Sequence, residues 1–143
     1  MRVLFDTNVI LDHLLAREPY VKAAEQLLSL VDVGRIEGVI CATTATTIHY
    51  LLAKHLGAEA ARRHLEILLD LLDVAEVNRA VLLRALRTEF SDYEDAVSHE
   101  AAVAADADVI VTRNLRDFSS ARLPVLSPDE LLAALVSGQE QVS

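Results

Sequence analysis

Short apolar runs alternate along the chain with longer segments whose apolar residues recur every three or four positions. The short runs predict strands at 2–5, 39–41 and 109–111. The longer segments predict helices at 8–16, 19–33, 43–55, 58–72, 78–87, 91–105 and 128–136. Segment 72–75 fits either a further strand or a helix end, because a short apolar run does not distinguish the two. Strands separated by helices favour one α/β domain with a mostly parallel central sheet and helices on both faces.

Capping residues support two of the expected helix starts. The tetrapeptides that begin at Ser91 and Ser127 have the S-x-x-E form of a capping box, so we place helix starts there. Glu94 is explained by this capping role and is assigned no chemistry. We expect residues 1–137 to form a single domain and residues 138–143 to form a frayed C-terminal tail.

The charge balance and the single cysteine limit the classes of function. The chain has 13 Lys and Arg against 22 Asp and Glu, a formal charge of −9, which argues against binding nucleic acid by bulk electrostatics. Cys41 stands alone and cannot form an intramolecular disulfide, which favours a reducing, cytoplasmic setting. Asp6 and Asp12 interrupt the apolar N-terminal stretch, and no uncharged segment is both long and apolar enough to span a bilayer. We therefore expect a cytoplasmic protein without a signal peptide or a membrane partner.

Polar side chains collect where the predicted strands end. In parallel α/β sheets, ligands bind beyond the carboxyl ends of the strands, and the helices that follow the strands begin at the same edge. The polar residues that the pattern places there include Asp6, Asn8, Thr47, Asp92, Asp95, Thr112, Arg113, Asn114 and Asp117. Carboxylate and amide oxygens suit a hard cation, Mg²⁺ or Mn²⁺ rather than Zn²⁺. Such a site is suited to the hydrolysis of phosphodiester bonds.

Three segments of the chain resemble the signature segments of the PIN-domain ribonucleases. They are FDTNVILD at 5–12, DYEDA at 92–96 and VTRNLRDF at 111–118, and their order and spacing match the family. The resemblance extends over nearly the whole chain, and the chain is similar to the toxin of VapBC-type toxin–antitoxin pairs. It implies a PIN-like three-layer sandwich and a metal-dependent endoribonuclease that acts on RNA. It also implies an antitoxin partner and a homodimer.

The resemblance further implies roles for individual residues. Asp6, Asp95 and Asp117 would be the catalytic carboxylates and would hold Mg²⁺ or Mn²⁺ together with Asn114, while Asn8 would support the site through hydrogen bonds. Asp92 is explained most simply by the helix dipole, so we prefer Asp95 as the ligand.

Four further residues are candidates for supporting roles around these ligands. His99 lies four residues after Asp95 and is expected to share its helix face. Arg113 either holds a phosphate or belongs to a solvated loop. Thr112 precedes it at the end of the last predicted strand, and Thr47 lies on the helix after the second strand.

Thr47 marks the departure from the family pattern, because the family usually has a glutamate there. A hydroxyl cannot replace an anionic metal ligand, so a second metal site and turnover itself are both open questions. The alternative function is therefore a catalytically weakened PIN-fold module that binds RNA or a protein partner. A phosphotransferase of the haloacid-dehalogenase type is disfavoured, because Asp6-Thr7-Asn8 lacks the second aspartate of its D-x-D segment.

Bound metal would also change the meaning of the acidic charge. Two divalent ions add four positive charges and bring the formal charge from −9 to −5. The potential would then reverse locally at the site where a phosphate must bind. The acid excess is thus compatible with an RNA substrate that binds through the metal.

Overall fold

The central layer of the protein is a parallel β-sheet. The computed structural model describes residues 1–142, with side chains for residues 1–138. Within this part the sheet has five strands in the order β3-β2-β1-β4-β5, and every neighbouring pair is parallel. The strands are β1 (Arg2–Phe5), β2 (Glu37–Cys41), β3 (Asp73–Ala75), β4 (Val109–Val111) and β5 (Val125–Leu126). The predicted α/β class with a parallel central sheet is confirmed.

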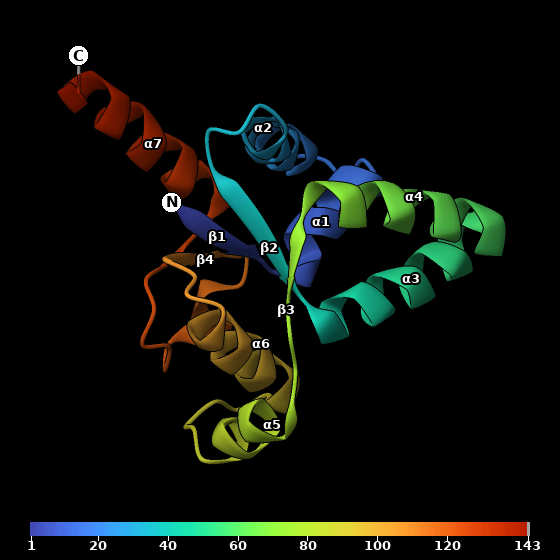
Figure 1. The fold of residues 1–143 in the computed structure, drawn as a ribbon. Helices are drawn as coiled ribbons and strands as arrows, with labels where there is room; N and C mark the ends of the chain where they lie inside the picture. The colour runs from blue at the N-terminus through green and yellow to red at the C-terminus, as the bar shows by residue number, and fades with distance from the viewer. Residues whose placement is uncertain (143) are drawn as a thin grey trace.

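Helices cover both faces of this sheet (Figure 1). The helices are α1 (Thr7–Leu14), α2 (Val21–Asp32), α3 (Ala42–Leu56), α4 (Ala58–Leu71), α5 (Arg79–Leu86), α6 (Tyr93–Ala104), α7 (Pro128–Val142) and the 3-10 helix η1 (Leu115–Phe118). One core lies between the sheet and α1, α2, α3, α4 and α7, and a second lies between the sheet and α5 and α6. The arrangement is the three-layer sandwich that the sequence predicted.

The alternation of side chains along β1 divides the two cores. Val3 and Phe5 are fully buried in the larger core, whereas Leu4 points to the opposite face and is buried against α6. Successive residues of a strand face opposite sides, so a strand with helices on both sides reads as a continuous apolar run. This is why the sequence RVLF shows no polar alternation.

The strand order places a crevice beside β1. The chain proceeds from β1 to β2 and β3 on one side, and then returns to the other side of β1 to form β4 and β5. Connections that leave in opposite directions from neighbouring strands open a crevice at the carboxyl ends of those strands. Phe5 pairs with Val111, so the residues that follow them, Asp6 and Thr112, lie next to each other at this edge. The fold therefore brings two segments together that are more than 100 residues apart in sequence.

Several element boundaries differ from the prediction. Segment 73–75 is a strand, because it completes the sheet edge by pairing with β2. Strand β5 and η1 were not predicted, since two and four residues are too few to show a period. The last helix begins with the predicted Ser127–Glu130 capping box but does not end at Val136.

Helix α7 continues to Val142 and so includes most of the predicted frayed tail. Ser143 and the side chains of residues 139–142 lie outside the described part of the chain. None of the helices described is long and apolar enough to cross a membrane.

Gly38 in β2 is required by close packing in the larger core. A Cβ atom there would overlap the side chain of Leu72 and lie 3.0 Å from Cγ2 of Val31 and 3.2 Å from Cε2 of Phe5. Overpacking of this kind costs about 1–3 kcal/mol, so Gly38→Ala is expected to lower the free energy of unfolding by that amount in a urea titration.

Gly138→Ala is the matched control for this prediction, because a Cβ atom on Gly138 in α7 meets nothing within 4 Å. In a helix this change is neutral or stabilising by up to about 1 kcal/mol. Equal stability of the two variants would contradict the packing argument.

Candidate metal centre

Asp6 is placed at the crevice by the end of β1 and the start of α1. It is the N-cap of α1, and its Oδ1 accepts a hydrogen bond from the backbone N–H of Thr7 at 2.9 Å. Its Oδ2 accepts a hydrogen bond from Oγ1 of the fully buried Thr112 at 2.7 Å. Asp6 therefore both caps α1 and lines the pocket.

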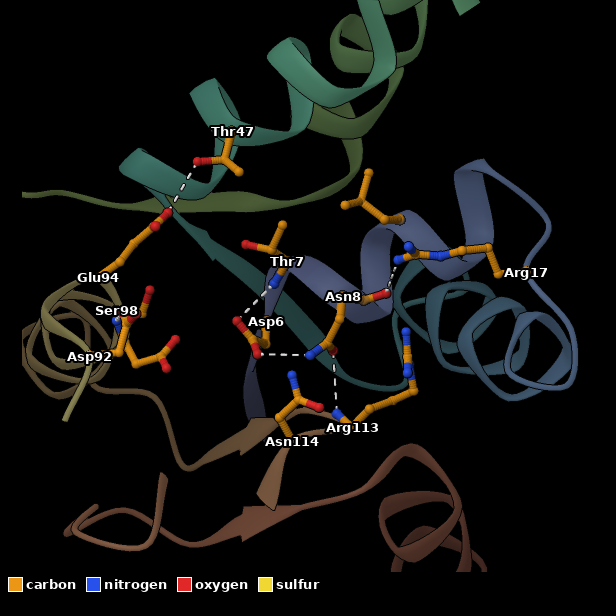
Figure 2. Close-up of a pocket in the computed structure, with 12 residues that line it drawn as sticks. Asp6, Thr7, Asn8, Arg17, Thr47, Asp92, Glu94, Ser98, Arg113 and Asn114 are labelled. Atoms are coloured by element: carbon orange, nitrogen blue, oxygen red, sulfur yellow. Dashed lines mark hydrogen bonds between the residues drawn. The ribbon is translucent and has the colours of Figure 1, made fainter. Parts of the chain in front are cut away.

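Asn8 and Thr112 fix the orientation of the Asp6 carboxylate, and Figure 2 shows the bond from Asn8. The Asn8 amide nitrogen donates to Asp6 Oδ2 at 3.2 Å and to Thr112 Oγ1 at 3.3 Å, while its oxygen accepts from the backbone N–H of Arg113. Thr112 Oγ1 also accepts from the backbone N–H of Asn114 at 3.0 Å. The hydroxyl thus uses one donor and two acceptor positions, its full capacity, so the carboxylate cannot rotate without breaking this network.

The start of α6 contributes a second group of carboxylates to the same pocket. Asp92 is the N-cap, and its Oδ1 accepts from the backbone N–H of Asp95 at 3.0 Å. The predicted start at Ser91 is therefore wrong by one residue. Glu94 does not serve the capping box that we assigned to it: its carboxylate accepts a hydrogen bond from the Thr47 hydroxyl at 3.1 Å (Figure 2). Asp95 is half-buried beside them.

The segment after β4 completes the far side of the site. Asn114 lines the pocket, and Asp117 is exposed on η1, where its backbone N–H bonds to the carbonyl oxygen of Asn114. Asp117 does not line the pocket, but its charge reaches both Asp6 and Asp95. Phe118 anchors the turn by packing edge-on against Phe90, with ring centroids 5.8 Å apart.

The carboxylates of the site carry negative charge that no neighbouring cation neutralises. Burial raises the pKa of Asp6, and the charges of Asp117 and Glu94 raise it further, against the hydrogen bonds from Thr112 and Thr7. Burial, followed by the charges of Asp6, Asp92, Asp117 and Glu94, raises the pKa of Asp95 to about 7. None of these five acids forms a salt bridge within the part of the chain that the structure describes.

The opposite wall of the pocket is basic. Arg17 and Arg113 line it, and both bind the buried carboxylate of Asp12, with Nε–Oδ distances of 2.9 and 2.6 Å. The Arg113 guanidinium also lies 3.9 Å from the ring centroid of Tyr20. Two arginines share one carboxylate, so this wall retains a net positive charge. Figure 2 shows Arg17 and Arg113 in the same pocket as the acidic side chains.

The donor set of the pocket suits a hard divalent cation. The pocket has a volume of about 330 Å³ and is lined by carboxylate, amide and hydroxyl oxygens. Among the described residues, no three His, Cys, Asp or Glu side chains are close enough to chelate an ion as they stand. Mg²⁺ retains several water ligands and uses one or two protein carboxylates, so an open, un-neutralised oxygen cluster fits it better than a closed cage would.

His99 is the one predicted site residue that the structure places elsewhere. Its ring is fully buried, its Nδ1 lies 2.7 Å from Oε2 of Glu100, and its Nε2 accepts from the backbone N–H of Arg122 at 3.0 Å. Burial lowers the pKa of His99, in agreement with a neutral ring that accepts at Nε2 and donates at Nδ1. The expectation that His99 shares a pocket-facing surface with Asp95 was wrong, because residues 96–102 are all buried. Asp95 lies at the edge of the pocket, whereas His99, one helical turn later, lies in the interior of the protein.

The other predicted residues converge around one crevice. The residues that line the pocket are Asp6, Asn8, Thr47, Asp92, Asp95, Arg113 and Asn114. Thr112 donates a hydrogen bond to Asp6, and the charge of Asp117 raises the pKa of Asp95. Sequence reasoning missed Arg17, the buried Ser98 and Glu94 as pocket residues. The capping pattern misdirected the interpretation of Glu94. Arg17 follows a helix end and gave no signal.

The fold and the pocket define an α/β protein with an acidic, oxygen-lined site at the switch point of a parallel sheet. The family model of the PIN domain matches residues 2–116. That match covers most of the chain, and the chain therefore belongs to the PIN domain family. A comparison with curated protein sequences finds no match.

Several solved structures with the same fold are described as toxin–antitoxin proteins. A chain of the VapBC2 complex of Rickettsia felis, bound to a promoter DNA fragment, is 16% identical with a TM-score of 0.71, covering 89% of this chain and 98% of that one. A chain of a toxin–antitoxin complex from Klebsiella pneumoniae is 22% identical with a TM-score of 0.67, covering 88% and 97%. VapC20 of Mycobacterium tuberculosis, a toxin that cleaves the sarcin–ricin loop, is 16% identical with a TM-score of 0.60, covering 76% and 86%. These likenesses show a shared fold.

The raised pKa of Asp95 makes stability depend on pH. The carboxyl ionises near 3.8 in the unfolded chain and at about 7 in the folded protein, so the folded state binds more protons between these values. Stability of the metal-free protein therefore falls as the pH rises through this window. Asp95→Asn is expected to raise the free energy of unfolding at about pH 8 and to change it far less at about pH 4.

Urea unfolding in the presence of a chelator measures this difference. Asp70→Asn, on the exposed surface of α4, is the control and should give similar small changes at both pH values. An effect of Asp95→Asn that is the same at both pH values would show that burial and charge repulsion do not raise the pKa of this carboxyl.

Proposed function

We propose that this protein is a metal-dependent endoribonuclease and the toxin of a toxin–antitoxin pair. The observation that carries the proposal is the convergence of Asp6, Asp95 and Asp117, un-neutralised, at the carboxyl edge of β1 and β4. Membership of the PIN domain family and the likeness of the fold to toxin–antitoxin structures support it.

Asp6, Asp95, Asn114 and Asp117 would hold Mg²⁺ or Mn²⁺. When bound, such an ion lowers the pKa of water and polarises a phosphoryl oxygen, which is the chemistry that phosphodiester hydrolysis requires. Asn8 and Thr112 both donate to Oδ2 of Asp6, and the backbone N–H of Thr7 donates to Oδ1, so both oxygens are kept in place. Asp92 holds the first turn of α6 and thereby positions Asp95.

The basic wall supports an RNA substrate. Arg17 and Arg113 line the pocket beside the carboxylates, and Asp12 fixes both guanidinium groups, so their free N–H groups would receive a phosphate without a search through rotamers. The acidic side would hold the metal and the basic side the RNA backbone. This division favours an RNA that is bound jointly by the ion and the arginines.

The proposal extends to partners and location. The relatives include chains from complexes of toxins with antitoxins, and we infer an antitoxin partner for this chain as well. A homodimer is inferred from the family resemblance of the sequence alone. A cytoplasmic location follows from the reducing environment that the single cysteine suggests.

One observation favours a second candidate function, a catalytically weakened PIN-fold module that binds RNA or a protein. Thr47 stands in the pocket where the family usually has a glutamate, and a hydroxyl supplies no charge to a metal ion. Such a module would bind RNA in the presence of Mg²⁺ or Mn²⁺ without cleaving it.

The variant Asp6→Asn tests the nuclease function. Asparagine caps a helix as well as aspartate does, so the start of α1 is retained while the anionic ligand is lost. Cleavage of a structured RNA in Mg²⁺ or Mn²⁺, followed by gel electrophoresis, is expected to drop about 100-fold or more.

The matched control is again Asp70→Asn, which removes an exposed carboxylate far from the pocket and should leave cleavage unchanged. Wild-type activity of Asp6→Asn would refute the nuclease assignment. Binding of RNA by the wild type without cleavage in either ion would favour the binding module.

A further inference from the structure

The hydrogen bond between Thr47 and Glu94 joins two features that sequence reasoning kept apart. Thr47 lies on α3 at the position where the family usually carries a glutamate, and Glu94 lies on the first turn of α6. The Thr47 hydroxyl donates to Oε1 of Glu94 at 3.1 Å, and both side chains line the same pocket as Asp6 (Figure 2). A carboxylate is thus present at the α3 side of the pocket although α3 does not supply it.

We propose that Glu94 is a metal-ligating residue of this site and supplies from α6 the negative charge that the family usually takes from α3. This inference rests on the proposed function, since it assigns a further ligand to the same ion. It explains how the chain accommodates threonine at position 47: the hydroxyl does not replace the missing carboxylate but orients one that arrives from the neighbouring helix.

The geometry of Thr47 agrees with an orienting role. Its hydroxyl has one proton and two acceptors within reach, the carbonyl oxygen of Thr43 at 3.2 Å and the Glu94 carboxylate at 3.1 Å. An ionised carboxylate is the stronger acceptor of the two. One oxygen of Glu94 is therefore held by α3, and the other oxygen is free of any hydrogen bond or salt bridge within the described residues.

The charge of Glu94 also acts on two of the proposed ligands. It contributes to the raised pKa of both Asp6 and Asp95, so its carboxylate lies within electrostatic reach of the two aspartates from β1 and α6. A purely structural link between α3 and α6 would not need a full negative charge at this place. Repulsion among these acids is a cost that a bound cation removes.

Glu94→Gln tests the charge and retains the hydrogen bond. The glutamine oxygen still accepts from Thr47, so a structural role predicts unchanged Mn²⁺ binding and an unchanged melting temperature of the metal-free protein. A ligand role predicts that Mn²⁺ affinity, measured by isothermal titration calorimetry, falls about tenfold or more with the melting temperature preserved. Glu66→Gln, on the exposed face of α4, is the matched control and should bind Mn²⁺ like the wild type.

Returning the carboxylate to α3 completes the test. The double variant Glu94→Gln with Thr47→Glu should regain most of the lost Mn²⁺ affinity, because the side chain at position 47 faces the same pocket. Wild-type affinity of Glu94→Gln, or a loss that the double variant does not recover, would overturn the assignment of Glu94 alone. Absence of Mn²⁺ binding by the wild type would overturn the proposed function together with it.

Discussion

The hydrogen bond from the Thr112 hydroxyl to the Asp6 carboxylate, 2.7 Å long, is the interaction on which the site depends. It joins the ends of β1 and β4, the two strands from which the chain departs in opposite directions, and it is buried where water cannot replace it. Such a bond to a charged group is worth more than a neutral one, and its loss would leave a buried acceptor unsatisfied. The pairing of β1 with β4 therefore sets the position of Asp6.

Repulsion among the acidic side chains around Asp6 opposes this arrangement of the site. Four further acids surround Asp6 without a neutralising cation among the described residues, and the basic side chains nearby are already committed to Asp12. The pocket is thus divided into an acidic side that lacks counter-charge and a basic side that retains a net positive charge. A formal charge of −9 is compatible with an RNA substrate under this division, because the charge that matters lies within one pocket and changes when an ion binds.

Most of the fold and much of the pocket could be predicted from the sequence. The apolar runs gave three of the strands, and the rule that ligands bind at the carboxyl ends of parallel strands brought Asp6, Asp95 and Asn114 together. His99 was misjudged from helical spacing and Glu94 from a capping pattern, and both signals are local: they describe one helix but not the segments packed against it. His99 meets Arg122 and Glu94 meets Thr47 through contacts between distant segments, and no local pattern records them.

The claim that these oxygens converge on a metal ion is tested most directly by where Mn²⁺ binds. Paramagnetic Mn²⁺ broadens the amide signals of nearby residues in an NMR spectrum of labelled protein. At substoichiometric Mn²⁺, the signals of Asp6, Asn8, Asp95 and Asn114 are expected to broaden first in the wild type and to remain sharp in Asp6→Asn. Broadening that is spread over the exposed acids of α4 instead, or that is unchanged in Asp6→Asn, would contradict the account.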